Sequence, residues 1–143
     1  MKRITILAVV ALIAIATIAC CPCRKSSSNN DFNLASTSWQ LTQLNSRSIP
    51  AVEDQYTLTL GDDGRAAGVA LCNNITGSYS FSAEARTLKF DHMGMTRMMC
   101  PPGSADYEDA YGKMLGSVTH YEVDGDMLVL LSNGNSVAVF RRL

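Results

Sequence analysis

The sequence predicts a mainly β protein: a small antiparallel β-barrel of about eight strands, with one α-helix inserted late in the chain. Two observations predict this fold class. Between Ser38 and Leu143, short β-like runs are separated by turn sequences, a spacing typical of an all-β barrel or sandwich. One segment around residue 110 departs from this rhythm, and its apolar residues recur every three or four positions, as on one face of a helix.

The first strands follow from apolar positions and one turn. Trp39, Leu41 and Leu44 indicate a strand at the start of the domain. Residues 56–60 alternate apolar side chains with threonine, the pattern of a half-buried strand. The acidic Asp-Asp-Gly turn at residues 62–64 then leads into a further strand over residues 65–71.

The remaining strands are expected as hairpins. They are predicted at residues 78–81 and 87–90, 120–123 and 127–131, and 136–141. The first pair is connected across residues 82–86. Asp124-Gly125-Asp126 and Asn133-Gly134 supply the turn residues of the others.

The helix is predicted after Pro101-Pro102-Gly103, which interrupts the β pattern, with Ser104 as its N-cap. Acidic residues in the first turns, Asp106, Glu108 and Asp109, suit the positive end of the helix dipole. The apolar stripe consists of Tyr107, Ala110, Tyr111, Met114, Leu115 and Val118. We expect this amphipathic helix to lie on the barrel or to plug one end of it.

The N-terminal segment predicts export and lipid attachment. Lys2 and Arg3 precede an apolar run over residues 4–19, which has the form of a signal peptide and is shorter than the roughly twenty residues of a membrane span. The run ends directly before Cys20, and residues 17–20 resemble the lipobox of bacterial lipoproteins, where the signal is cut before a lipid-modified cysteine. An ordinary cleavable signal, or lipidation at Cys21, are the alternatives.

These features divide the chain into a lipoprotein signal peptide (1–19), a lipidated cysteine with a flexible polar tether (20–33) and one β-barrel domain (34–143). The expected location is the bacterial cell envelope, lipid-anchored to the inner or outer membrane, with the domain outside the cytoplasm. Loss of residues 1–19 would lower the basic residues from 12 to 10 against 13 acidic ones. The remaining chain has no basic cluster, so nucleic acid is not an expected partner.

Cys72 and Cys100 are the only cysteines inside the predicted domain. Export to an oxidising compartment favours a disulfide between them. Two buried free thiols, which pack as small apolar groups, and a pair of metal ligands are the alternatives.

The residues around these cysteines resemble a known family. Residues 68–79 read GVALCNNITGSY and residues 96–100 read TRMMC. Together with Trp39-Gln40-Leu41, Glu108 and the closing residues 139–142, they resemble the META domain, or HslJ-like, family. Leu71 stands where this family usually has Gly, and Met99 where it usually has Ala.

The resemblance implies a small antiparallel barrel with a late helix, found mostly in envelope proteins that are often lipoproteins. Members are linked to the heat-shock response and novobiocin resistance, and no enzymatic activity is established for them. The fold also resembles secretion pilot proteins, some of which hold lipid. We therefore expect a non-enzymatic protein-interaction or assembly role in envelope stress or drug tolerance, without a cofactor. The alternative is a carrier of a small apolar ligand or lipid inside the barrel, where Ala66, Ala67, Gly68 and Ala70 hint at spare volume.

Asn73, Thr96 and Arg97 are the candidate binding residues. The Arg97 guanidinium suits a carboxylate or phosphate, but an internal ion pair with Asp91, Asp106 or Glu108 is the favoured interpretation. Asn73 and its neighbour Asn74 are expected to form a turn by bonding nearby backbone.

Metal binding and catalysis have little support. His92 and the methionines of residues 93–99 offer soft ligands for Cu(I), but methionine is also a common core filler, and no metal is expected. The chain has no GxSxG motif and no matched set of nucleophile, base and carboxylate, so no enzyme is predicted.

Overall fold

A computed structural model describes residues 32–143 of the chain. The predicted signal peptide, Cys20 and Cys21, and the predicted tether up to residue 31 lie outside the described residues. Within residues 32–143, no helix has the length and the apolar character that crossing a bilayer requires.

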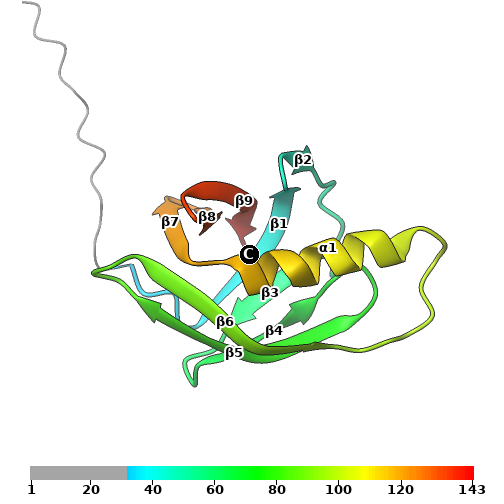
Figure 1. Ribbon diagram of the computed structural model, residues 1–143, viewed down its shortest axis with the longest axis horizontal. Coiled ribbons are helices and arrows are strands. Elements are labelled where there is room, and N and C mark those ends of the chain that lie inside the picture. Colours follow the sequence, from blue (N-terminus) through cyan, green and yellow to red (C-terminus); the bar gives the residue numbers. More distant parts are fainter. Residues whose placement is uncertain (1–31) are drawn as a thin grey trace, which may run out of the picture.

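The described residues form strands and a single late helix (Figure 1). In chain order these are β1 (Thr37–Leu44), β2 (Arg47–Ser48), β3 (Thr57–Leu60), β4 (Arg65–Val69), β5 (Asn74–Ser82), β6 (Thr87–Met95), α1 (Ser104–Ser117), β7 (His120–Asp124), β8 (Met127–Ser132) and β9 (Asn135–Arg142).

Eight of these strands close into an antiparallel barrel, which confirms the predicted fold class. The strands are hydrogen-bonded in the order β1-β3-β4-β5-β6-β7-β8-β9, and β9 pairs back with β1. The short β2 lies outside the barrel and pairs only with the end of β1. The sequence did not predict β2, because two residues are too few to show a period.

Several strand features follow directly from the local sequence. In β3, Leu58 and Leu60 are buried and Thr59 is exposed, as the alternation predicts. Asn133 and Gly134 both have positive φ angles, 49° and 82°, as required by the tight turn that joins β8 to β9. β5 and β6 extend to nine residues each, and the sequence predicted only four of each, because the added segments 74–77 and 91–95 each contain a glycine and begin with Asn74 and Asp91, residue types that are depleted in strands.

The barrel is weakly joined between β6 and β7, and α1 lies at this place. Only Thr87 of β6 pairs in register with β7, opposite His120. The chain leaves the far end of β6, forms α1 and returns as β7, and α1 packs against β6. In Figure 1 the helix passes between the part of the barrel formed by β4–β6 and the part formed by β7–β9. The helix therefore covers the opening that the parting strands leave.

The start of the helix differs from the prediction. Ser104 is its first residue, and Gly103, with φ 86°, occupies the N-cap position without a side-chain hydrogen bond. The Ser104 hydroxyl instead donates to the carbonyl of Pro101, at 2.6 Å, within the preceding turn. Tyr107, expected in the apolar stripe, is 37% exposed, and Glu108, expected to interact with the helix dipole, is 5% exposed. The buried face of the helix is therefore rotated towards Glu108.

Bulky side chains fill the interior of the barrel. Those below 2% exposure include Trp39, Tyr111, Phe140 and eight leucines: Leu34, Leu41, Leu58, Leu60, Leu88, Leu115, Leu128 and Leu130. The helix contributes Tyr111, whose hydroxyl donates to the Thr57 carbonyl at 3.1 Å.

At Gly68, the small residue in β4 serves close packing of the backbone and not spare volume. A Cβ atom on Gly68 would lie 2.0 Å from the Thr57 carbonyl oxygen. Ala66 and Ala70 are completely buried. The absence of a side chain at Gly68 therefore allows close contact between β4 and β3.

One aromatic cluster lies where β1 and β9 close the barrel. Trp39 pairs in register with Arg142. The Arg142 guanidinium lies 5.4 Å from the Trp39 ring centroid and 4.8 Å from that of Phe32. The first described residue is in this way packed against the closing strands, by an attraction between a cation and two ring faces.

Candidate functional site

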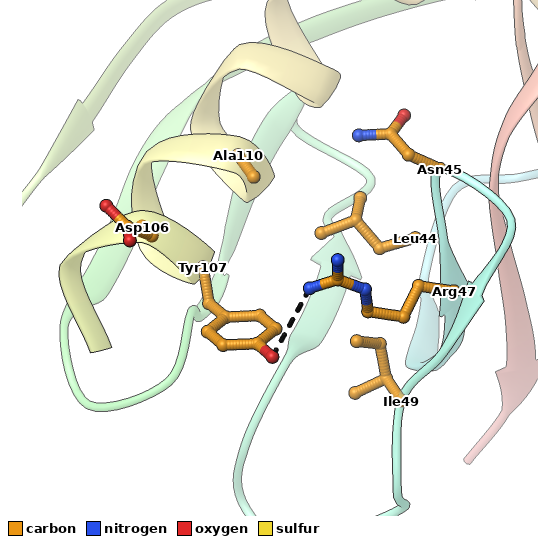
Figure 2. A pocket seen from close by; sticks show the side chains of 7 residues that line it. All are labelled: Leu44, Asn45, Arg47, Ile49, Asp106, Tyr107 and Ala110. Atoms are coloured by element: carbon orange, nitrogen blue, oxygen red, sulfur yellow. Dashed lines mark hydrogen bonds between the residues drawn. The ribbon is translucent and has the colours of Figure 1, made fainter. Parts of the chain in front are cut away.

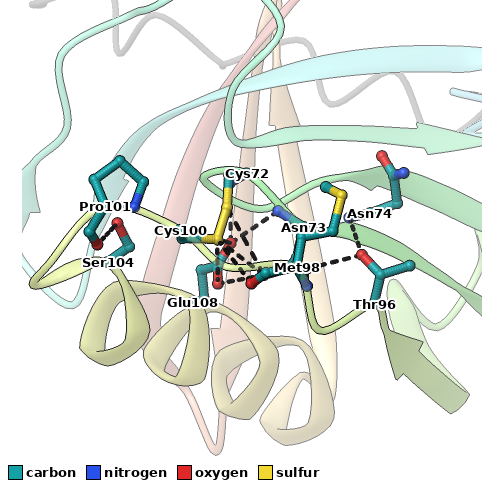
Figure 3. Close-up of a disulfide and its surroundings, with 9 residues drawn as sticks. All are labelled: Cys72, Asn73, Asn74, Thr96, Met98, Cys100, Pro101, Ser104 and Glu108. Carbon is teal, nitrogen blue, oxygen red and sulfur yellow. Dashed lines mark hydrogen bonds between the residues drawn. A yellow bond between two sulfur atoms is a disulfide. The ribbon is translucent and has the colours of Figure 1, made fainter.

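A disulfide joins two loops at one end of the barrel (Figure 3). Cys72 lies between β4 and β5, and Cys100 lies between β6 and α1. Their Cα atoms are 6.1 Å apart, a normal separation for a disulfide. The predicted pairing is confirmed, and the alternatives of free thiols or of a metal-binding pair do not describe this structure.

Glu108 extends from α1 to the loop that carries Cys72. Its Oε1 accepts hydrogen bonds from the backbone N–H groups of Cys72 and Asn73, both at 2.9 Å. Its Oε2 accepts from the side-chain Nδ2 of Asn73 at 2.8 Å. The carboxylate thus supplies the acceptors for two backbone N–H groups of this turn.

Asn73 connects three segments of the chain. Its Nδ2 group also approaches Cys100 Sγ at 3.1 Å. Its Oδ1 accepts from the Thr96 hydroxyl at 2.9 Å and from the Met98 backbone N–H at 2.6 Å. The side chain is buried. The prediction that it bonds backbone nearby in the sequence was wrong, because the backbone group that its side chain accepts from is the Met98 N–H, 25 residues away.

Asn74 and Thr96 complete this arrangement. Asn74 begins β5 and does not belong to the turn, contrary to the prediction. Its backbone N–H donates to the Thr96 hydroxyl at 3.0 Å, while the Thr96 backbone N–H donates to the Asn74 carbonyl at 3.0 Å. We call the connected set Cys72, Asn73, Thr96, Met98, Cys100 and Glu108 the Glu108 network.

The network keeps Glu108 ionised. Burial by itself would raise the pKa of this carboxyl, but the hydrogen bonds from the Cys72 backbone and from the side chain and backbone of Asn73 favour the charged form. Together they lower the pKa below its usual value of 4.5. The carboxylate is therefore a fixed negative acceptor at neutral pH.

Arg97 is not part of the network. It is exposed, and within residues 32–143 it forms no ion pair with Asp91, Asp106 or Glu108. The predicted internal pair was therefore wrong. The flanking residues Thr96 and Met98 are fixed by Asn73, so the guanidinium extends from an anchored loop.

A cleft of about 470 Å³ lies between this loop and α1. Met93, Met95 and Met98 contribute its apolar surface, and Arg97 and Lys113 contribute positive charge. Met93 and Met95 also pack against the core, which supports the interpretation of these two as core filler. Met98 is 54% exposed and its neighbour Met99 is fully exposed.

The sequence reasoning missed the role of Glu108. Its negative charge near the helix start already had a sufficient local explanation in the helix dipole. One signal was available: Glu108 stands between Tyr107 and Tyr111, inside the predicted apolar stripe. A carboxylate on a buried face needs hydrogen-bond donors from another segment.

Comparison with known proteins gives one family and several similar folds. The META domain matches residues 32–143. A solved protein from Burkholderia xenovorans is 28% identical, with a TM-score of 0.59, over 77% of this chain and 83% of that one. A second protein solved by NMR is 19% identical, with a TM-score of 0.59, over 74% and 88%.

A DUF4847 family protein from Bacteroides vulgatus is 14% identical, with a TM-score of 0.54, over 76% of this chain and 93% of that one. These last two similarities concern the fold alone. None of the curated proteins matches the chain.

Proposed function

The chain belongs to the META domain family, and on this basis we propose that it is a non-enzymatic, membrane-anchored envelope lipoprotein that binds a protein partner. The proposed setting is the envelope stress response or drug tolerance. The proposed contact surface is the loop of residues 96–99 together with the adjacent cleft along α1.

The observation that carries this proposal is the exposure of apolar side chains on an anchored loop. Met98 and Met99 are exposed beside Arg97, which forms no ion pair with the residues that the structure describes. Methionine and arginine are both enriched at protein interfaces, where methionine adapts to the shape of a partner. Neighbouring exposed apolar residues are a common mark of interaction surfaces.

Preorganisation supports the same role. The disulfide holds the end of this loop, and the Asn73 amide accepts the Met98 backbone N–H. A loop that is already ordered loses less conformational entropy when it binds, so more of the contact energy contributes to affinity.

Two features support a role without catalysis. Both oxygens of Glu108, the buried carboxylate of the site, are engaged by donors. Its pKa is lowered, whereas a general acid or base that works near neutral pH needs a raised one.

Site-specific photo-crosslinking in cells tests the proposal. A photo-crosslinking phenylalanine analogue is placed at position 99 of the full-length protein, and at position 122 as the control, where the native Glu122 is exposed on β7. We expect a discrete protein adduct from position 99 only, which is lost when Met98→Ser is added. Equal labelling from both positions, or none from position 99, would contradict the proposal.

A second candidate function is transport of an apolar ligand. The filled barrel gives no support for the interior site that was expected, but the methionine-lined cleft has about 470 Å³, within the range of roughly 300–1,000 Å³ typical of ligand pockets. A native mass spectrum of the protein, taken directly from envelope extract, distinguishes the two roles. A retained mass of a few hundred daltons that Met95→Ser removes would favour the carrier.

A further inference from the structure

A second cavity lies between α1 and the β1–β2 hairpin (Figure 2). It has a volume of about 200 Å³. The buried side chains of Leu44 and Ile49 and the methyl group of Ala110 form its apolar surface. None of the residues of the Glu108 network lines it, so it is a separate site.

Polar groups from both walls converge on this cavity. The Arg47 Nη1 group donates to the Tyr107 hydroxyl at 3.4 Å, and its guanidinium carbon lies 5.8 Å from the centre of the tyrosine ring. Because the Tyr107 oxygen is the acceptor, its own proton remains available to a ligand. Asn45 adds an amide from the hairpin, and its side chain is directed towards the helix in Figure 2.

We propose that this cavity binds a small organic monocarboxylate with an apolar body. The Arg47 guanidinium offers paired N–H donors to a carboxylate, and no carboxylate within residues 32–143 forms an ion pair with it. Three donor side chains beside an apolar surface match a molecule that is charged at one end only. Asp106 also borders the cavity, so a second negative charge on the ligand would be repelled.

The site is formed before a ligand arrives. The β1–β2 turn places Asn45 and Ser46 at positive φ angles of 46° and 66°, as in a tight two-residue hairpin. The Ile49 backbone N–H then donates to the Thr42 carbonyl at 2.9 Å. The backbone of Arg47 is thus held by a short hydrogen-bonded hairpin, so less backbone entropy is lost when a ligand binds.

Ligand-observed saturation-transfer NMR with benzoate and the full-length protein tests the assignment. Benzyl alcohol, with the same body and no charge, and phthalate, with two charges, are the comparison ligands. We expect saturable binding of benzoate and markedly weaker binding of both others. If benzyl alcohol or phthalate binds as tightly as benzoate, or if no ligand saturates, the assignment is overturned.

Variants locate the binding. Arg47→Gln should weaken benzoate binding about tenfold, since a charge-assisted hydrogen bond is lost. Tyr107→Phe, which removes one hydroxyl and keeps the ring, should weaken it about threefold. Arg65→Gln is the matched control, because Arg65 is exposed in β4 and does not border the cavity. Unchanged affinity in both the Arg47 and Tyr107 variants, with melting curves like the wild type, would overturn the proposal.

Discussion

Glu108 stabilises a segment that is distant in sequence by accepting its backbone hydrogen bonds. The N–H groups of Cys72 and Asn73 both point at one carboxylate oxygen. A buried N–H group without an acceptor costs about 1–3 kcal/mol. The charge on Glu108 is accordingly a structural requirement of the loop that carries the disulfide.

Replacing Glu108 by glutamine should lower the free energy of unfolding by about 2 kcal/mol at pH 7. Glutamine keeps one acceptor, but it turns an amide N–H₂ group towards the Nδ2 donor of Asn73. Urea denaturation measures the loss. Asp109→Asn is the control, because Asp109 is exposed on the next position of the helix and should change stability by less than about 0.5 kcal/mol.

Acid should remove the advantage of Glu108. The pKa of Glu108 in the folded protein lies below 4.5, so around this pH the folded protein binds fewer protons than the unfolded chain does. Its contribution is complete above pH 4.5 and disappears as the pH falls through the lower, folded-state value. Thermal melts from pH 7 to pH 3 should therefore show the wild type converging on the Glu108→Gln variant. A constant difference across this range would contradict the assignment.

Cys72→Ala or Cys100→Ala should each destabilise the domain by roughly 3–4 kcal/mol, because the disulfide closes a loop with a separation of 28 residues. The measurement is a thermal melt with and without a dithiol reductant. Reductant should lower the wild type to the level of the variants and leave the variants unchanged. Melting curves that are identical for wild type and variants would count against a stabilising disulfide.

At the scale of residues, the sequence identified most members of the site and few of their contacts. Cys72 and Cys100 were selected as the only cysteines of an exported domain, and Asn73 and Thr96 from a family pattern that names residue types. Such a pattern does not show which atoms meet. The distant partners of Asn73 come from the loop after β6 and from α1, and only the closed barrel brings these segments together.

At the scale of elements, β3 and β4 approach each other too closely for any side chain at Gly68. A Cβ atom there would lie 2.0 Å from the Thr57 oxygen and 2.8 Å from its carbonyl carbon, and both are backbone atoms. Gly68→Ala should therefore cost more than about 3 kcal/mol or prevent folding. Gly94→Ala in β6 is the control, because its Cβ would lie 3.9 Å from the nearest other atom. Comparable circular dichroism melts for the two variants would contradict this reading of the packing.

The sequence predicted the helix and the main hairpins because their periods and turn residues are local signals. It did not predict that β6 and β7 share a single pair in register. Strand pairing depends on where the helix between them packs, and this is decided by tertiary contacts. The same reason explains why Glu108, and not Tyr107, faces the interior.

At the scale of the whole molecule, the two proposed sites share one end of the barrel. The segment that precedes β1, blue in Figure 1, lies at one end, and the loop between β6 and α1 lies at the other. An anchor in the N-terminal part of the chain would therefore be attached at the end of the domain opposite the 96–99 loop.

The anchor itself is testable. Cys20→Ser should release the protein from the membrane fraction, because the acyl chains would have no attachment point. Fractionation followed by immunoblotting measures this, with Cys72→Ser as the control that should stay membrane-bound. Retention of the Cys20 variant would assign the lipid to Cys21 or indicate an uncleaved anchor.

The cluster of Trp39, Phe32 and Arg142 has an optical consequence. Trp39 is the only tryptophan of the chain, and it is completely buried where β1 meets β9. Fluorescence excited at the long-wavelength edge of protein absorption therefore comes from Trp39 alone. An emission spectrum that stays constant during ligand or partner titration therefore reports an intact barrel closure, and a red shift reports its opening.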